Sequence, residues 1–180
     1  MKQDLEIREL INRLTRLDAA TAWGGDLNPT QRAVLDYLGR ANRFSRSPSH
    51  VAEYLGSTRG TVSQSFKSLV QKGYVTERRS KLDKRAISFE LTETGNAVAS
   101  AQNPLTIALA DYPEGEKDNL LASLRGVLGA MLSQNKSRPF GICSSCMHHE
   151  TTSNGGYCRL LSKPLLPFET HQICYEHETT

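Results

Sequence analysis

The chain has 180 residues, of which 38% are hydrophobic, and its formal net charge is +3. This length suits one domain with an appendage, and the hydrophobic fraction is sufficient for a buried core. The basic excess is too small to indicate a nucleic-acid partner unless the basic residues gather on one face. No segment approaches the roughly 18 apolar residues of a membrane helix. The start mixes charged with apolar residues, unlike a signal peptide, so we expect a cytoplasmic protein without membrane contact.

The first predicted elements are two helices. Residues 3–22 form an amphipathic pattern in which leucines and isoleucines recur on one face. Such a helix needs a partner surface, either a dimer interface or the core of its own chain. A second helix begins around Pro29, because proline is tolerated in a first helical turn, and a polar break over residues 43–47 follows it.

Residues 48–72 predict two short helices around a tight turn at Gly56. A hydroxyl at Ser57 or Thr58 can cap the second of them by accepting a hydrogen bond from an unpaired backbone N–H. The apolar positions of that second helix are spaced by four and three residues, and they are Val62, Phe66 and Leu69. This arrangement is typical of a helix-turn-helix.

Beyond Gly73 the hydrophobic period changes to that of strands. Two strands, around residues 74–76 and 86–91, flank a polar and basic tip and so predict a wing. A helix follows from Thr92 to about residue 109, with a break at residues 111–113. The helix predicted over 114–134 carries an apolar stripe wide enough for both a core and a partner helix.

The second helix of the helix-turn-helix and the wing supply the candidate binding residues. Once the apolar stripe is buried, the exposed helix face carries hydroxyls, an amide and cations, namely Arg59, Thr61, Gln64, Ser65 and Lys67. Such side chains can hydrogen-bond to base edges and phosphates in the major groove. The alternative is an ordinary solvated helix face. The wing concentrates cations suited to phosphate contact, namely Arg78, Arg79, Lys81, Lys84 and Arg85. Asp83 can orient Arg85 by a charge-assisted hydrogen bond.

These motifs together resemble the MarR family of bacterial regulators over about residues 5–135. The resemblance rests on Asn28-Pro29-Thr30-Gln31, the helix-turn-helix, and a wing running through Asp83-x-Arg85 to Leu91-Thr92-x-x-Gly95. It implies a homodimer with intertwined first and last helices, recognition helices in successive major grooves and wings in the minor grooves. It also implies that Arg85 is the wing-tip arginine and Asp83 its partner. Half-sites would lie about 34–36 Å apart on a near-palindromic operator in double-stranded DNA.

The segment beyond residue 136 departs from that family pattern, and it resembles a cysteine-rich extension carried by a subset of such regulators. It holds four cysteines, Cys143, Cys146, Cys158 and Cys174, in a Gly- and Pro-containing stretch with little apolar sequence. In a reducing compartment, such a cluster favours a metal site over structural disulfides. Four thiolates suit structural zinc or an iron–sulfur cluster. The single close pair favours the cluster, because structural zinc usually takes two close pairs.

Two other features of this segment bear on its chemistry. Its histidines, expected at the surface or as donors to the ligands, are His148, His149, His171 and His177. The alternative to a metal is a reversible disulfide between Cys143 and Cys146, although no thioredoxin-like strand and helix surround the pair.

The predicted fold is mainly α with a small β wing. Residues 1–136 form a winged-helix domain with dimerisation helices, and residues 137–180 form a separate metal-binding tail that packs near those helices. Our main hypothesis is a dimeric repressor whose DNA affinity responds to iron or redox state through the four-cysteine centre. One alternative is a repressor released by a small molecule such as an aromatic acid, with a zinc tail. The other is a redox or electron-transfer module on a winged-helix adaptor. No catalytic constellation is visible, so we do not expect an enzyme.

Overall fold

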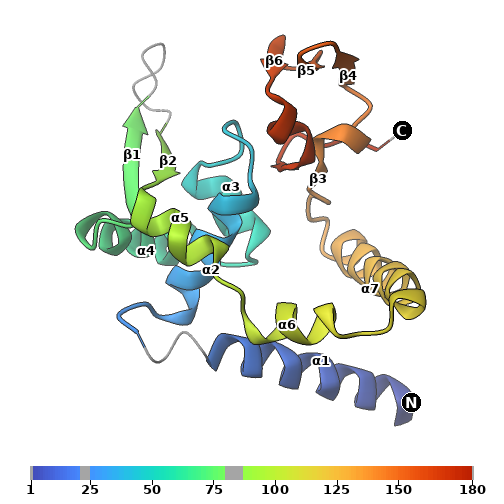
Figure 1. Ribbon diagram of the computed structural model, residues 1–180. Coiled ribbons are helices and arrows are strands. Elements are labelled where there is room, and N and C mark those ends of the chain that lie inside the picture. Colours follow the sequence, from blue (N-terminus) through green and yellow to red (C-terminus); the bar gives the residue numbers. More distant parts are fainter. Residues whose placement is uncertain (1, 21–24, 80–86, 180) are drawn as a thin grey trace.

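The computed structural model describes residues 2–20, 25–79 and 87–179 (Figure 1). Its architecture is mainly helical with small antiparallel sheets, as the sequence predicts. The helices are α1 (Lys2–Ala20), α2 (Pro29–Arg40), α3 (Pro48–Tyr54), α4 (Arg59–Gln71), α5 (Glu93–Ser100), α6 (Pro104–Ala110) and α7 (Glu114–Gln134). In the part of the chain that is described, no helix is long and apolar enough to cross a membrane.

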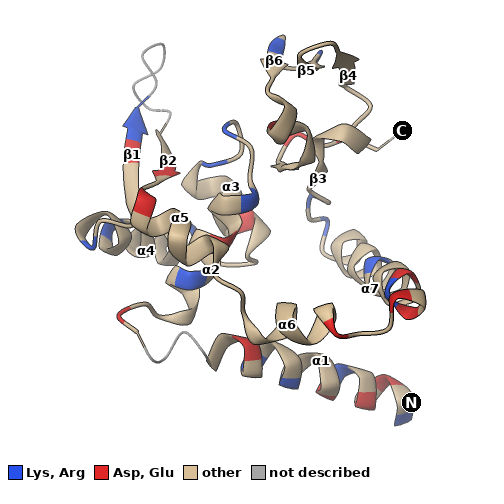
Figure 2. Ribbon diagram, viewed as in Figure 1, with Lys and Arg blue, Asp and Glu red and all other residues tan. Residues whose placement is uncertain are grey.

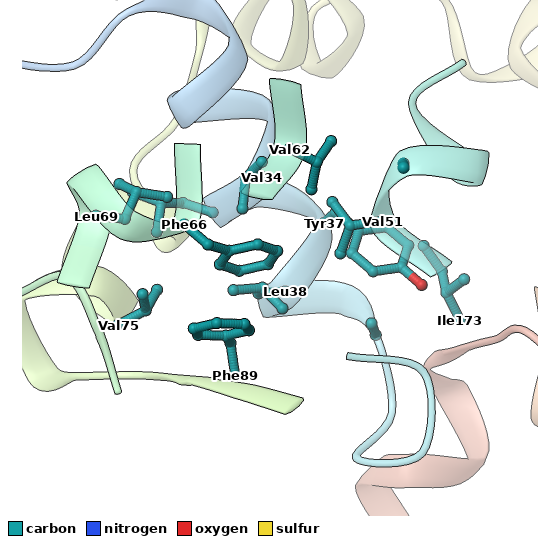
Figure 3. Close-up of a cluster of buried hydrophobic side chains, with 13 residues drawn as sticks. Val34, Tyr37, Leu38, Val51, Val62, Phe66, Leu69, Val75, Phe89 and Ile173 are labelled. Atoms are coloured by element: carbon teal, nitrogen blue, oxygen red, sulfur yellow. The ribbon is translucent and has the colours of Figure 1, made fainter. Parts of the chain in front are cut away.

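The main core lies between α2, α3, α4 and a two-stranded wing. The wing strands β1 (Val75–Arg79) and β2 (Ile87–Leu91) pair antiparallel, with Val75 opposite Leu91. Phe66 of α4 stacks on Phe89 of β2 with ring centroids 3.9 Å apart, as Figure 3 shows. Burial of these rings fixes α4 against the wing, so the outer faces of both elements lie on one side of the domain.

Side-chain caps set the helix boundaries in this core. Asn28 and Gln31 form a reciprocal capping box at the start of α2, and Thr58 caps α4 by accepting a hydrogen bond from the Thr61 N–H. Gly56, in the turn between α3 and α4, has a φ of 58°, which glycine adopts without a steric penalty. The predicted boundaries of α2 and of the helix-turn-helix are confirmed.

One predicted helix is two helices in the structure. The sequence predicts a single helix from Thr92 to about residue 109, but α5 ends at Ser100 and α6 begins at Pro104. Asn103 caps α6 through its side chain, and Pro104 lacks the N–H that a continuous helix would require. These two residues therefore explain the break.

A close backbone contact joins the wing to α5. The Thr92 hydroxyl donates to the Gly73 carbonyl at 2.7 Å and caps the Gly95 N–H at 3.1 Å. A Cβ at position 95 would lie 2.1 Å from the Tyr74 carbonyl oxygen. The structure therefore requires glycine at position 95 for steric reasons, and Thr92 caps the same turn.

Helices α1 and α7 leave their apolar side chains exposed in the single chain. Helix α1 packs against α6, and neither α1 nor α7 contains a buried residue. The exposed apolar side chains include Leu10, Leu14 and Leu17 of α1 and Leu124, Leu128 and Met131 of α7. Such faces are the kind that a partner surface covers.

The C-terminal segment is built from short strands and single 3₁₀ turns. Its strands are β3 (Gly141–Ile142), β4 (His149–Thr152), β5 (Gly155–Cys158), β6 (Lys163–Leu165) and β7 (Ile173–Cys174). Strands β4, β5 and β6 form one small sheet, and β3 pairs with β7. Buried apolar residues of its own are Cys143, Leu165 and Cys174, and Ile173 belongs to the winged-helix core instead (Figure 3).

Its contacts correct one expectation about the tail. The sequence places the tail near the dimerisation helices, but its hydrogen bonds run to the loop between α2 and α3. The Asn42 N–H donates to the Ile173 carbonyl at 2.9 Å, and the Tyr175 N–H donates to the Ser45 hydroxyl at 2.8 Å. The physical reason is burial of Ile173 in the winged-helix core.

Candidate functional site

The outer face of α4 carries the polar side chains that the sequence predicts for it. Arg59, Thr61, Gln64 and Lys67 are exposed, while Val62, Phe66 and Leu69 are buried. The Thr61 hydroxyl also contacts the Thr58 hydroxyl at 2.9 Å, which holds the first turn of α4 in place. This face therefore presents an amide, hydroxyls and cations from a rigid helix.

Ser65 is the exception on this helix, because it is buried rather than exposed. Only 7% of its surface is accessible, and its hydroxyl donates to the Thr61 carbonyl at 3.0 Å. Position 65 follows Val62 by three residues and precedes Leu69 by four, which puts it on the buried stripe. The burial of Ser65 could therefore be predicted from helical spacing in the sequence.

The described end of the wing adds two exposed arginines. Arg78 pairs with Glu90 at 2.9 Å, and Arg79 pairs with Glu77 at 2.7 Å. Figure 2 shows the basic end of β1 pointing away from the core. The other predicted wing residues lie outside the described residues, and they are Lys81, Asp83, Lys84 and Arg85.

An open hollow of about 670 Å³ lies between α3, α4 and the wing. Its cations are Arg59, Arg78 and Arg79, and around them lie Phe44, Ser47, Ser49, His50, Ser63 and Ser88. Sequence reasoning did not select this second group, because its members come from the α2–α3 loop, α3, α4 and β2. One local signal was available: Ser47 before Pro48 is a typical helix start, and the Ser47 hydroxyl caps α3 at the His50 N–H.

The cysteines gather at the base of the C-terminal segment, where all four are free thiols. Cys143 and Cys174 are buried, and Cys158 packs against them together with Phe44 of the α2–α3 loop. Cys146 lies one 3₁₀ turn from Cys143, since its N–H donates to the Cys143 carbonyl at 3.0 Å. Strand pairing thus brings cysteines that are far apart in the sequence into one region.

Hydrogen bonds to sulfur favour the thiolate form at part of this cluster. A hydrogen bond from the Cys143 thiol lowers the pKa of Cys174 to about 6, with a further contribution from Asn42. The same bond, together with burial, raises the pKa of Cys143. The Glu178 N–H lies 3.5 Å from the Cys146 sulfur. Thiolates are the form in which cysteine binds metals.

Two histidines lie next to the cysteines. His177 contacts the Ser145 hydroxyl at 3.1 Å inside the Cys-x-x-Cys turn, and its Nδ1 is buried without a hydrogen bond. His149 is opposite Cys158 on the neighbouring strand. Among the residues that the structure describes, no three His, Cys, Asp or Glu side chains already stand as a set of metal ligands.

These elements define a class of protein. A helix-turn-helix whose second helix lies against a two-stranded wing is a winged helix-turn-helix domain. In this chain the exposed polar face of α4 and the arginines of β1 place hydrogen-bond donors and positive charge next to each other.

Comparison with known proteins shows a family similarity over part of the chain. The model of the MarR family matches residues 25–86, which include α2, the helix-turn-helix and β1. The HTH-type transcriptional regulator SarZ of Staphylococcus haemolyticus is 35% identical over 72 residues, which are 38% of this chain and 49% of that protein. The chain thus spans about half the length of this curated relative. Residues 25–86 are thus similar to the MarR family, and the cysteine segment lies outside the matched residues.

Solved structures share the fold. The S. aureus MepR–DNA complex aligns with a TM-score of 0.57 at 19% identity, covering 72% of this chain and 97% of MepR. Streptococcus pneumoniae FabT in complex with DNA aligns with a TM-score of 0.58 at 22% identity, covering 74% of this chain and 96% of FabT. A MarR/EmrR family regulator from Acinetobacter sp. ADP1 aligns with a TM-score of 0.58 at 23% identity, covering 72% and 94% of the two chains.

Proposed function

We propose that this chain is a cytoplasmic, dimeric transcription regulator that binds double-stranded DNA and is not an enzyme. The observation that carries the proposal is the exposed face of α4 beside the arginines of the wing, around one open basic hollow. The fold relatives MepR and FabT have been solved with DNA, which supports the same use of this face. The exposed leucines of α1 and α7 support a homodimer, because a second copy can cover both faces.

In the proposed complex, α4 enters the major groove and the wing contacts the backbone beside it. Arg59, Gln64 and Lys67 supply donors to base edges and phosphates, while Arg78 and Arg79 supply charge for phosphates. A two-fold dimer then requires a near-palindromic operator with half-sites one turn apart, about 34–36 Å.

Salt dependence of duplex binding tests this proposal. Each cation that contacts a phosphate contributes about 0.9 to the slope of log affinity against log salt. We expect a steep negative slope for the wild type by fluorescence anisotropy on a labelled duplex, and a slope about one smaller for Lys67→Ala. Lys163→Ala, on the exposed strand β6, makes the same charge change away from the hollow and is the matched control. Binding that is absent at low salt, or equal losses in both variants, would contradict the proposal.

The finer proposal is that the cysteine segment holds a metal centre that modulates DNA binding. Its support is the donor set: buried Cys143 and Cys174, with Cys158 packed against them and Cys146 in the adjoining turn. The favoured occupant is an iron–sulfur cluster, with zinc as the alternative, and iron or redox state is the proposed signal. Either occupant would offset part of the thiolate charge and cross-link a segment that has few buried apolar residues of its own.

Elemental analysis separates these occupants. Protein purified without oxygen is assayed for iron, sulfide and zinc, and its visible spectrum is recorded. Matched iron and sulfide with visible colour indicate a cluster, whereas about one zinc per chain in a colourless protein indicates a structural staple. Cys158→Ala is expected to lower either content. A protein that carries neither, and takes up neither on reconstitution, would contradict the metal proposal.

The alternative proposal is that a small molecule regulates DNA binding, and a second hollow offers a place for it to bind. It has a volume of about 480 Å³, lies between α2, α5 and α6, and includes Arg40 and Asp36 in its lining. Arg40 can pair with the carboxylate of an aromatic acid. Release of bound duplex by such acids, lost in Arg40→Ala, would support this alternative. No release across a panel of acids would count against it.

A further inference from the structure

One short loop, residues 41–46, lies between the cysteine segment and the basic hollow. It follows α2 directly and leads into Ser47, the cap of α3. On one side it bonds to the C-terminal segment, and on the other it contacts the elements that line the hollow. We call residues 41–46 the linking loop.

Asn42 is the centre of the linking loop and is completely buried. Its side-chain N–H donates to the Cys143 sulfur at 3.2 Å, and its side-chain oxygen accepts from the Phe44 N–H and the Ser45 hydroxyl. Its backbone N–H donates to the Ile173 carbonyl. One side chain thus joins a cysteine ligand candidate to the internal bonds that shape the loop.

A second set of contacts reinforces this docking. Arg43 bonds to Glu169 and to the Pro164 carbonyl, both in the C-terminal segment. Tyr175, directly after Cys174, stacks on His50 of α3 with ring centroids 3.8 Å apart. The cysteine segment therefore contacts α3, the first helix of the helix-turn-helix, as well as the loop.

On its other side the linking loop reaches the proposed DNA-binding surface. The Phe89 N–H of β2 donates to the Arg46 carbonyl at 3.1 Å, which ties the loop to the wing. Phe44 packs against the buried cysteines and also lines the hollow that contains the three arginines. Phe44 therefore contacts both the hollow and the cysteine cluster.

A centre bound by the cysteines would act directly on these contacts, because Cys143 is one of the partners of Asn42. The segment has few buried apolar residues apart from the cysteines themselves, so a bound centre would add to the order that its docking contacts provide. Without that order, Asn42 would lose the sulfur and carbonyl partners that hold the linking loop, and Ser45 would lose the Tyr175 N–H. Buried polar groups left without partners are costly, so the loop would rearrange.

We propose that loading of the four-cysteine centre is transmitted through Asn42 and the linking loop to α3 and the wing, so that the loaded protein is the high-affinity DNA-binding form. This inference rests on the proposed function and adds the direction of its regulation. Asn42 is a positioning residue in it. Reciprocity requires that DNA binding raise the affinity of the centre for its occupant by the same factor.

The test compares duplex affinity of the full chain without metal and with Zn²⁺ as the probe for four thiolates. We expect Zn²⁺ to tighten wild-type binding by at least about fivefold, within the range of about 5–150-fold usual for coupled sites. Asn42→Ala should still bind Co²⁺ with the absorption of cobalt thiolate, and it should bind duplex with the affinity of the metal-free wild type. Zn²⁺ should change that affinity less than twofold. Asn154→Ala, in the exposed turn between β4 and β5, is the matched control and should keep the full response.

Two outcomes would overturn the inference while leaving DNA binding established. One is a duplex affinity that Zn²⁺ does not change or weakens, and the other is a full Zn²⁺ response in Asn42→Ala. Failure of the proposed function itself has a different signature, which is no duplex binding at low salt with or without Zn²⁺.

Hydrogen exchange tests the inference without DNA, and it does not require that the Asn42→Ala variant fold. Zn²⁺ should slow amide exchange in residues 41–55 of the wild type as well as in the cysteine segment. Asn42→Asp keeps the oxygen that bonds to Phe44 and Ser45 but lacks the donor to sulfur. It should retain slow exchange in α2 while losing the Zn²⁺ effect at residues 41–55. Slowing confined to the cysteine segment of the wild type would contradict transmission through the loop.

Discussion

Ile173 is the residue by which the cysteine segment enters the winged-helix core, and its truncation tests that docking. It is 8% exposed and belongs to the same cluster as Tyr37 and Val51 (Figure 3). Truncation of a buried isoleucine to alanine removes its transfer free energy and leaves a cavity, at a cost of about 2–5 kcal/mol. Because Ile173 lies at the edge of the core, where collapse is easier, we expect about 2–3 kcal/mol for Ile173→Ala.

That cost should appear in the unfolding of the winged helix itself. For a chain of this size, about 1 kcal/mol shifts Tm by roughly 2–4 °C, so Ile173→Ala should lower Tm by roughly 4–12 °C. The measurement is thermal unfolding by far-UV circular dichroism, together with amide exchange in α2 and α4. Ile142→Ala is the matched control, since Ile142 pairs with Ile173 across β3 and β7 but is 38% exposed. Its cost should stay within about 0.5 kcal/mol.

The reasoning would be refuted by one result in particular. If Ile173→Ala accelerates exchange only within residues 140–178, and the winged helix keeps its Tm and its slow amides, the segment does not share that core. Equal effects of the two isoleucine substitutions would point to loss of the β3–β7 ladder instead of loss of docking.

Three further predictions concern other parts of the chain. Leu128→Glu should convert a dimer to a monomer in analytical ultracentrifugation, because it places a charge on the exposed apolar face of α7; retention of the dimer would show that this face is not its interface. Gly95→Ala should destabilise the fold by more than the about 0.5 kcal/mol of an ordinary surface change, since its Cβ would meet the Tyr74 carbonyl at 2.1 Å, and unchanged denaturant unfolding would exclude that clash. Burial lowers the pKa of His50 below its usual 6.5, so the unfolded chain binds more protons in that window and stability falls as pH drops below about 6.5. His50→Phe keeps a ring against Tyr175 and should reduce this pH dependence, while an unchanged profile would assign it to other histidines.

The parts of the fold that sequence predicts are those with local signals. The cap residues Asn28 and Thr58 and the spacing of Val62, Phe66 and Leu69 act within a few residues, and the structure has the helices where these signals put them. The break between α5 and α6 also has a local cause, Asn103 before Pro104. The sequence predicts a single helix there because apolar residues recur with a helical period on both sides of Asn103.

The candidate site divides in the same way. Exposure on α4 follows from helical spacing, and Ser65 shows that the spacing must be applied to every position, polar ones included. The basic hollow could not be predicted, because Phe44 and Ser63 come from different elements that meet only after folding. Ile173 stands in the short run Ile173-Cys174-Tyr175 within a polar stretch, and a run of this length has no periodicity that could assign it to a core.

The docking of the cysteine segment changes how a signal from it would reach the operator. The chain leaves the winged helix through α5 and passes along α6 and α7 (Figure 1). It returns to the winged helix through the core contacts of Ile173 and the contacts of Tyr175 with Ser45 and His50. Helix α7 is therefore tied to the winged helix at both of its ends. Release of the cysteine segment would free one of these ties, so α4 could move relative to α7. In a dimer held by α1 and α7, such movement changes the distance between the two α4 helices, and a fixed half-site spacing on DNA would penalise it. If the proposed centre exists, its docking on the α2–α3 loop would thus couple it to the spacing of the two α4 helices through the linking loop.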